Sequence, residues 1–301
     1  MKLRDRKVLK DNFIQMNYKA ILFYLGLFIF PLSGLAFLNI LYSTYFDYFL
    51  SIDSYTVTFF LSLVTGSFFY YYGKNSIKKI NFYEQLLLII SVYLISSIFI
   101  ALPYYLSNYQ ITFFDSVFES FSGLTSTGFS IFENIKYLDP TLILWRSSSQ
   151  WIGGLYFLIF LIIVFSNNQY NFRLNQLVFT GNMGPFSKSN TKNILLQIFL
   201  VYSLLTLIIF IILNLGNVRL FNSLNLSMTI ISNGGFLPTN SLDQIFLKDD
   251  RYILAITLLI PTINIFFLFN LFNRKRIVND HQEDLFLIMF ISILSLVMFY
   301  T

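Results

Sequence analysis

Long apolar segments constrain this chain more than any other feature of its sequence. A helix that crosses the hydrocarbon core of a bilayer needs about 20 mostly apolar residues. Six such runs are present: Tyr18–Leu41, Tyr55–Tyr72, Phe82–Leu106, Pro140–Ser166, Thr191–Leu215 and Tyr252–Phe272. A seventh begins at Leu285 and continues to Thr301. Only 12% of the residues are charged, against roughly 25% in soluble proteins. We therefore expect an all-α protein embedded in a lipid bilayer.

Two further apolar segments, Phe113–Leu124 and Leu220–Ile231, are too short to span a bilayer. Each would be roughly 18 Å long as a helix. Each is followed directly by small polar residues and glycine. Apolar segments of this length are typical of re-entrant elements or buried helices. We expect both to enter and leave the membrane from the same side.

Clusters of basic residues between the apolar runs predict the orientation, because Lys and Arg are enriched on the cytoplasmic side. They precede the first span, follow the second, separate the fourth from the fifth and follow the sixth: Lys2, Arg4, Arg6, Lys7, Lys10, Lys74, Lys78, Lys79, Arg173, Lys188, Lys192, Arg274, Lys275 and Arg276. The exceptions lie around the two short segments: Lys136, Arg146, Arg219, Lys248 and Arg251. The pattern predicts a cytoplasmic N-terminus, with residues 42–54, 107–139 and 216–251 facing outward. We interpret the positive net charge as a topology signal and expect no binding to nucleic acid.

Catalytic chemistry has little support in the sequence. There is no cysteine, and His281 is the single histidine. The membrane segments contain no paired carboxylates, no His/Asp cluster and no nucleophile motif. We therefore expect that the chain is not an enzyme and that it needs no cofactor.

An internal repeat appears when the sequence is shifted by 107 residues. Phe114-Asp115-Ser116-Val117 then falls on Phe221-Asn222-Ser223-Leu224, and Gly128-Phe129 falls on Gly235-Phe236. The repeated unit is a span, a short helix, a glycine loop and a second span. We expect four regions: an N-terminal tail with two extra spans (1–80), a first repeat (81–190), a second repeat (191–280) and the start of a third (281–301).

A span, short helix, loop and span is the architecture of a cation pore. A dehydrated cation exchanges its water for backbone carbonyl oxygens that line a loop. Non-helical backbone at membrane depth is tolerated where it is buried or lines water, and glycine permits the backbone conformations that such a loop needs. The predicted filter residues are Thr125, Ser126, Thr127 and Gly128 in the first loop, and Ser232, Asn233, Gly234 and Gly235 in the second.

Three polar residues near the loops are predicted to support them. Glu119 lies within the first short helix, where a structural hydrogen bond to the loop is favoured over direct attraction of an ion. Arg146 and Gln150 lie four residues apart on one face of the following span. Because a nearby positive charge would repel a permeating cation, we interpret them as an anchor for the loop.

Three sequence segments resemble the TrkH-like membrane subunits of the Trk/Ktr/HKT superfamily. They are FESFSGLTSTGFS (Phe118–Ser130), WRSSSQWIGG (Trp145–Gly154) and MTIISNGGFLPTNS (Met228–Ser241). The resemblance implies potassium as the transported ion, four repeats around one pore and one filter glycine in each repeat. By motif, these glycines are Gly128 and Gly235, with Gly234 ranked second.

The resemblance also implies a homodimer in the cytoplasmic (inner) membrane and a cytosolic nucleotide-binding regulatory subunit. The sequence departs from the superfamily pattern because it stops within a third repeat. We expect it to be the N-terminal part of a longer chain; the alternative is that two half-pores assemble.

Three other functions remain open at this point. A sodium-permeable pore belongs to the same superfamily, in which a serine in the first loop favours sodium. Glycine at position 128 instead favours potassium. Transport coupled to another ion and a non-conducting membrane scaffold are the further alternatives.

Overall fold

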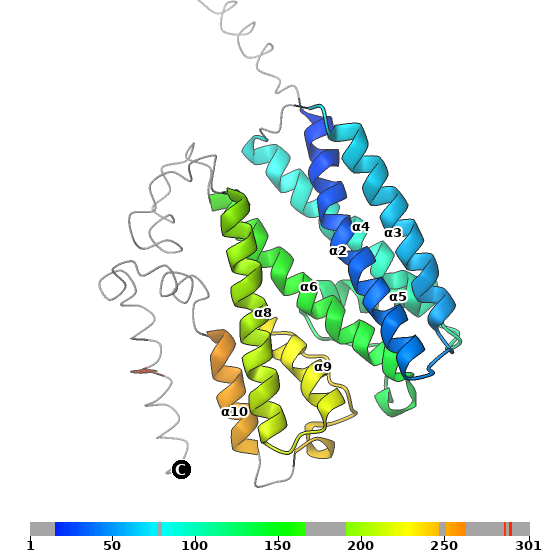
Figure 1. The fold of residues 1–301 in the computed structure, drawn as a ribbon, viewed down its shortest axis with the longest axis vertical. Coiled ribbons are helices and arrows are strands. Elements are labelled where there is room, and N and C mark those ends of the chain that lie inside the picture. Colours follow the sequence, from blue (N-terminus) through cyan, green and yellow to red (C-terminus); the bar gives the residue numbers. More distant parts are fainter. Residues whose placement is uncertain are drawn as a thin grey trace, which may run out of the picture. The chain divides into compact units, whose positions relative to one another are not determined.

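The computed structural model describes residues 16–76, 80–165, 191–246 and 251–262, together with positions 286, 289 and 290. Every regular element in these residues is a helix (Figure 1). Five of the described helices are long and apolar enough to cross a membrane. The expectation of an all-α membrane protein is confirmed. The chain divides into two compact units, Met1–Phe113 and Phe114–Thr301.

The first unit contains three long helices: α2 (Tyr18–Tyr45), α3 (Ile52–Gly73) and α4 (Phe82–Tyr105). Helices α2 and α3 lie side by side, and α4 packs against both (Figure 1). A methyl group added at Gly26 would lie 2.7 Å from the carbonyl oxygen of Gly66. The backbones of α2 and α3 therefore approach closely at two small residues, which is a common way for membrane helices to pack.

One carboxylate joins the starts of two helices in the first unit. Glu84 is buried in the first turn of α4. Its Oε2 accepts a hydrogen bond from the backbone N–H of Asn81, the N-cap of α4, at 2.7 Å. Its Oε1 accepts one from the N–H of Asn17, the N-cap of α2, at 2.6 Å. This arrangement satisfies backbone donors at two helix starts with a single side chain.

The second unit contains the two short helices that precede the loops, two long helices and a further helix of nine residues. The short helices are α5 (Phe113–Leu124) and α9 (Leu220–Ile231); the others are α6 (Pro140–Phe165), α8 (Thr191–Leu215) and α10 (Arg251–Leu259). Helices α6 and α8 pack against α9, and α10 packs against α8 (Figure 1). Each short helix leads into an irregular loop, and these two loops form the candidate site.

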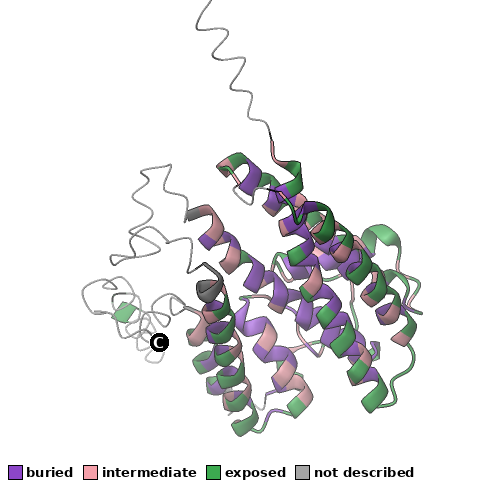
Figure 2. Cartoon of the chain, turned by 45° about the horizontal axis from the view of Figure 1, so that its top comes forward, coloured by how far each residue is buried: buried purple, intermediate pink, exposed green. Residues whose placement is uncertain are grey.

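Large apolar side chains remain exposed on the long helices. In Figure 2 the same helices carry buried residues on one face and exposed residues on another. Phe60 and Phe68 of α3 are 62% and 63% exposed, and Leu200 and Leu207 of α8 are 54% and 55% exposed. Apolar surface on this scale would promote aggregation in water. It is compatible with a surrounding bilayer.

Most of the predicted helix boundaries agree with the structure. The bounds of α5, α8 and α9 are those predicted, α4 ends one residue earlier than predicted, and α6 extends to Phe165, the last described residue before position 191. Helix α2 continues to Tyr45, and α3 begins at Ile52, so the connection between them is shorter than expected.

The predicted sixth span differs. Helix α10 ends at Leu259 and is followed by a 3-10 turn, η4 (Ile260–Thr262). Pro261 lies in that turn; it lacks an N–H and disfavours helical geometry in the preceding residue. The remainder of this span, His281 and the seventh apolar run apart from positions 286, 289 and 290 lie outside the described residues. The division between the compact units falls inside the predicted first repeat, whose boundaries remain a prediction.

Candidate functional site

The two short helices are equivalent elements of an internal repeat. The bounds of α5 and α9 differ by the shift found in the sequence, since 113 + 107 = 220 and 124 + 107 = 231. Both helices have 12 residues. The backbone beyond each helix also follows the repeat, which gives the two loops a common starting geometry.

Each short helix ends in the same backbone motif. Ser126 and Asn233 both have a positive φ, of 55° and 51°. After α5, the N–H of Ser126 donates to the carbonyl of Gly123 at 2.9 Å, and the N–H of Thr127 donates to that of Ser122 at 2.9 Å. The equivalent bonds after α9 run from Asn233 to Ile230 at 3.0 Å and from Gly234 to Thr229 at 2.8 Å. This is the Schellman arrangement, in which a left-handed residue ends a helix and pairs its last carbonyls.

The two predicted filter glycines lie against each other. A Cβ atom at Gly128 would lie 2.9 Å from the Cα of Gly235, and one at Gly235 would lie 3.3 Å from the Cα of Gly128. Gly128 also has a φ of +82°, which disfavours any side chain there. The loops therefore meet at the two positions where the sequence predicted the filter, and neither position accommodates a side chain without movement.

Hydroxyl groups in the loops bond mainly to nearby backbone. The Thr125 hydroxyl donates to the carbonyl of Phe121 at 2.7 Å and lies 2.7 Å from the hydroxyl of Thr127. Ser232 donates to the carbonyl of Met228 at 3.0 Å. Such bonds satisfy a hydroxyl locally. Contact between these residues and an ion remains a prediction.

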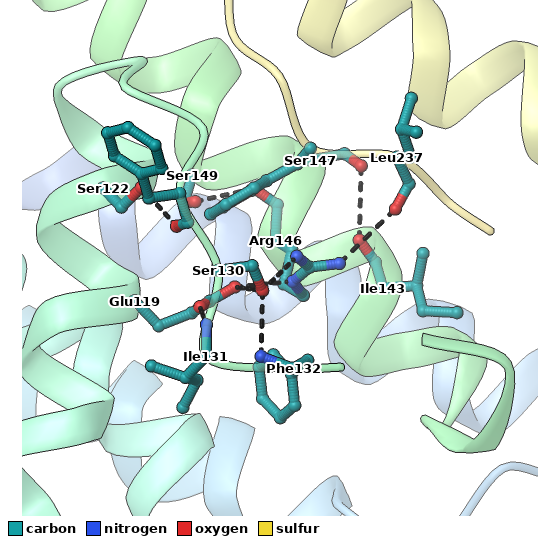
Figure 3. Close-up of polar contacts among 12 residues, drawn as sticks. Glu119, Ser122, Ser130, Ile131, Phe132, Ile143, Arg146, Ser147, Ser149 and Leu237 are labelled. Carbon is teal, nitrogen blue, oxygen red and sulfur yellow. Dashed lines mark hydrogen bonds and ion pairs between the residues drawn. The ribbon is translucent and has the colours of Figure 1, made fainter. Parts of the chain in front are cut away.

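A buried ion pair supports the first loop (Figure 3). Nε of Arg146 on α6 lies 2.8 Å from Oε1 of Glu119 on α5, and both side chains are at most 1% exposed. The Arg146 Nη2 donates to the hydroxyl of Ser130 at 2.9 Å. The carboxylate of Glu119 accepts bonds from the Ser130 hydroxyl at 3.0 Å and from the N–H of Ile131 at 2.9 Å. The charge of the arginine is thus balanced, and the segment after the filter is held to both helices.

Arg146 also reaches the second loop. Its Nη1 donates to the carbonyl of Leu237 at 3.4 Å, and these two residues face each other in Figure 3. Its guanidinium carbon lies 4.3 Å from the ring centroid of Phe236 and 5.4 Å from that of Phe132. Stacking on aromatic faces adds a favourable cation–π interaction. The guanidinium group therefore contacts residues that follow both filters.

Gln150 holds the second loop from one turn further along α6. It is fully buried, and its Oε1 accepts a hydrogen bond from the N–H of Phe236 at 3.2 Å. A side chain at Gly234 would overlap the Gln150 carboxamide. The absence of a side chain at position 234 leaves space for the carboxamide of Gln150. Packing therefore explains the first of the two glycines in the Ser-Asn-Gly-Gly-Phe loop (232–236).

Gly153 and Gly154, the glycine pair of the WRSSSQWIGG segment, let α6 pass close to the C-terminal ends of α5 and α9. A Cβ atom at Gly153 would overlap the carbonyl of Leu124, the last residue of α5. One at Gly154 would lie 2.7 Å from the hydroxyl of Tyr202 and 2.9 Å from Cβ of Ser232. These contacts explain the spacing of the segment. Its polar residues, Arg146 and Gln150, bind the loops, and its glycines leave space for the ends of the two short helices.

Several residues of the site were not assigned from the sequence. Ser130, Phe236 and Leu237 complete the surroundings of Arg146, and Asn240 joins the two loops. The repeat shift could not reveal Phe236, Leu237 and Asn240, because they contact partners in the other repeat rather than equivalent positions. Ser130 bonds to Glu119 and Arg146 within its own repeat. In the described part of the chain no group of three or more His, Asp or Glu side chains could hold a metal ion.

Comparison with known proteins finds relatives that are all named as cation transporters or potassium uptake proteins. No family model matches the sequence. An uncharacterized cation transporter of Methanocaldococcus jannaschii is 29% identical over 193 residues, which cover 61% of this chain and 39% of the relative. The Trk system potassium uptake protein TrkH of Escherichia coli strain K12 is 25% identical over 190 residues, which cover 61% of this chain and 38% of the relative. The matched region thus spans about two fifths of these relatives, which are transporters and not enzymes.

A solved structure shares the fold. The crystal structure of the potassium transporter TrkH from Vibrio parahaemolyticus matches with a TM-score of 0.71 and 21% identity, over 86% of this chain and 52% of that chain. The resemblance inferred from the three sequence segments is confirmed. Together, the sequence matches and the shared fold show that the chain resembles the TrkH-like membrane proteins of the Trk/Ktr superfamily.

Proposed function

We propose that this chain forms two walls of a potassium-conducting pore. The observation that carries the proposal is the meeting of two equivalent helix–loop units at Gly128 and Gly235. In a pore of this kind, carbonyl oxygens of the loops replace the water around the ion. The C-terminal ends of α5 and α9 lead into the loops, so the negative ends of their dipoles favour a cation there.

Charge balance at the site supports the same function. Arg146 lies close behind both loops and would repel a cation if it were alone. Its pairing with Glu119 at 2.8 Å leaves no net charge on this support. The structure of the support is therefore compatible with passage of a cation at the loops.

Potassium is the proposed ion, for two reasons. Glycine occupies the first filter position, and several relatives are named as Trk system potassium uptake proteins. By the same similarity, the chain would lie in the cytoplasmic membrane with its N-terminus inside. It would associate with a second copy and with a cytosolic nucleotide-binding regulatory subunit.

Substitution of the filter glycines tests this function. The complete reading frame that contains residues 1–301 is expressed in a bacterium that lacks potassium uptake, and potassium and sodium uptake are measured. We expect Gly128→Ala to lower the preference for potassium over sodium by about tenfold or more, because strain at a left-handed residue costs roughly 1–3 kcal/mol. Gly235→Ala should have a smaller effect, since its added Cβ would be 3.3 Å from the nearest atom.

Gly34→Ala in α2 is the matched control, because nothing lies within 4 Å of a Cβ atom there. It should leave uptake unchanged. An unaltered potassium preference in both filter variants, with normal amounts of protein in the membrane, would refute the filter assignment. Uptake of sodium in preference to potassium by the unmodified protein would favour the sodium-permeable alternative, and no uptake of either ion would favour a scaffold.

A further inference from the structure

The segments that follow the two filters contain a second pair of equivalent elements. A short 3-10 helix, η1 (Ile135–Tyr137), follows the first loop, and another, η2 (Leu242–Gln244), follows the second. They are again 107 positions apart, since 135 + 107 = 242. Asn240 lies two residues before η2 and is exposed. Its partners, however, belong to the first repeat.

Asn240 caps η1 from the other repeat. Its Oδ1 accepts hydrogen bonds from the N–H groups of Ile135 at 2.7 Å and Lys136 at 3.3 Å. Its Nδ2 donates to Oδ1 of Asn134, the residue that precedes η1, at 3.1 Å. The first N–H groups of a helix have no partner within the helix. Asn134 makes no such bond with its own side chain, so the carboxamide of Asn240 takes over the capping position.

The cap is the third of three hydrogen-bonded connections between the two repeats. Gln150 bonds to the N–H of Phe236 deep in the unit, and Arg146 bonds to the carbonyl of Leu237 beside it. Asn240 makes the next tie, three residues beyond Leu237. Arg146 and Gln150 connect the second loop to α6. Asn240 instead connects the segment after the second loop directly to the segment after the first.

We propose that Asn240 is a positioning residue that sets the spacing of the two filter loops and thereby the choice between cations. The inference rests on the proposed pore function. Selectivity in a carbonyl-lined filter depends on the size of the cage or on the number and field of its oxygens. Both quantities change if Gly128 and Gly235 move apart. A direct bond between the segments that follow these glycines limits this movement.

The internal repeat supplies a matched control. Glu133 occupies the position equivalent to Asn240, because 133 + 107 = 240, and it is also exposed. Its substitution by glutamine alters a polar side chain at the same place in the other repeat. It leaves the cap of η1 intact.

The test compares three variants in the uptake assay, with the apparent KM and maximal rate measured for potassium and sodium. Asn240→Leu keeps the size of the side chain but loses all three hydrogen bonds. We expect it to raise the KM for potassium and to lower the potassium preference by about fivefold, as for the loss of one to two ordinary hydrogen bonds. Asn240→Asp retains an acceptor for both N–H groups and should restore most of the preference. Glu133→Gln should behave as the unmodified protein.

A purely structural role would reduce the amount of protein and the maximal rate but leave KM and the preference unchanged, and that result would overturn the inference. Equal impairment by Asn240→Leu, Asn240→Asp and Glu133→Gln would also overturn it, because it would show a general sensitivity of the outer surface. If the Gly128 and Gly235 variants change the preference while Asn240→Leu does not, the pore function stands and only the inference fails. If the unmodified protein shows no potassium uptake, both fail.

Discussion

At the scale of single residues, the Glu119–Arg146 pair is the most demanding feature of the second unit. Two charges are removed almost completely from water, and each is acceptable only because the other is present. We expect Glu119→Gln to destabilise the protein by about 3–5 kcal/mol, because the guanidinium group then stays buried without a counter-charge. Thermal unfolding of the protein purified in detergent measures the effect.

The double variant Glu119→Leu/Arg146→Met separates charge from packing. Leucine is the residue that the second repeat has at the equivalent position, Leu226. Replacement of a buried pair by apolar residues of similar size is often close to neutral. The double variant should therefore be more stable than Glu119→Gln. Equal or greater destabilisation would show that the hydrogen bonds to the loops, rather than the paired charges, dominate.

Residues that follow a sequence spacing or the repeat were predictable, and residues whose role depends only on packing were not. The glycines and the polar pair on α6 could be found because they follow a spacing or a repeat. Nothing in the sequence indicates that Phe236 stacks on Arg146, or that the carboxamide of Asn240 caps a turn about a hundred residues away. Such contacts depend on how the elements pack, which periodicity does not encode.

At the scale of elements, the joint start of α2 and α4 is held by one side chain. Glu84→Ala removes the acceptor for the N–H groups of Asn17 and Asn81. We expect a loss of about 2 kcal/mol, within the range measured for helix caps. Glu84→Gln, which keeps one acceptor oxygen, should be intermediate in a denaturation series.

Asp53 provides the comparison for Glu84. It also lies in the first turn of a helix, α3, but its side chain is exposed. Asp53→Ala should cost less than about 1 kcal/mol, the usual limit for an exposed charge at a helix end. Similar losses for Glu84→Ala and Asp53→Ala would mean that the shared cap contributes nothing beyond the helix dipole.

Helix positions were predictable where apolar length alone decides them. The seven α-helices from α2 to α9 follow the predicted order, and the two short ones have the predicted bounds. The break in α10 shows the limit of this approach. Apolar composition continues through Pro261, so length suggested one span, whereas the backbone requirements of proline end the α-helix before it.

At the scale of the whole molecule, the distribution of basic residues predicts which connections lie outside. Asp47 and Asn75 are exposed positions at the ends of α2 and α3. Because the chain has no cysteine, single Asp47→Cys and Asn75→Cys variants can be tested in intact cells with a thiol reagent that does not cross the membrane. We expect labelling at position 47 only. Labelling at position 75 and not at 47 would invert the predicted topology.

The burial of the Arg146–Glu119 pair has a consequence for titrations with salt. Adding potassium chloride raises ionic strength together with the potassium concentration, and exposed charges about 10 Å apart are then largely screened. A pair at most 1% exposed is beyond the reach of the mobile ions that cause this screening. The interaction between Arg146 and Glu119 should therefore be equally strong in dilute and in concentrated salt. If uptake or stability differs between potassium chloride and sodium chloride at equal concentration, the difference then arises from the loops and not from the Arg146–Glu119 pair.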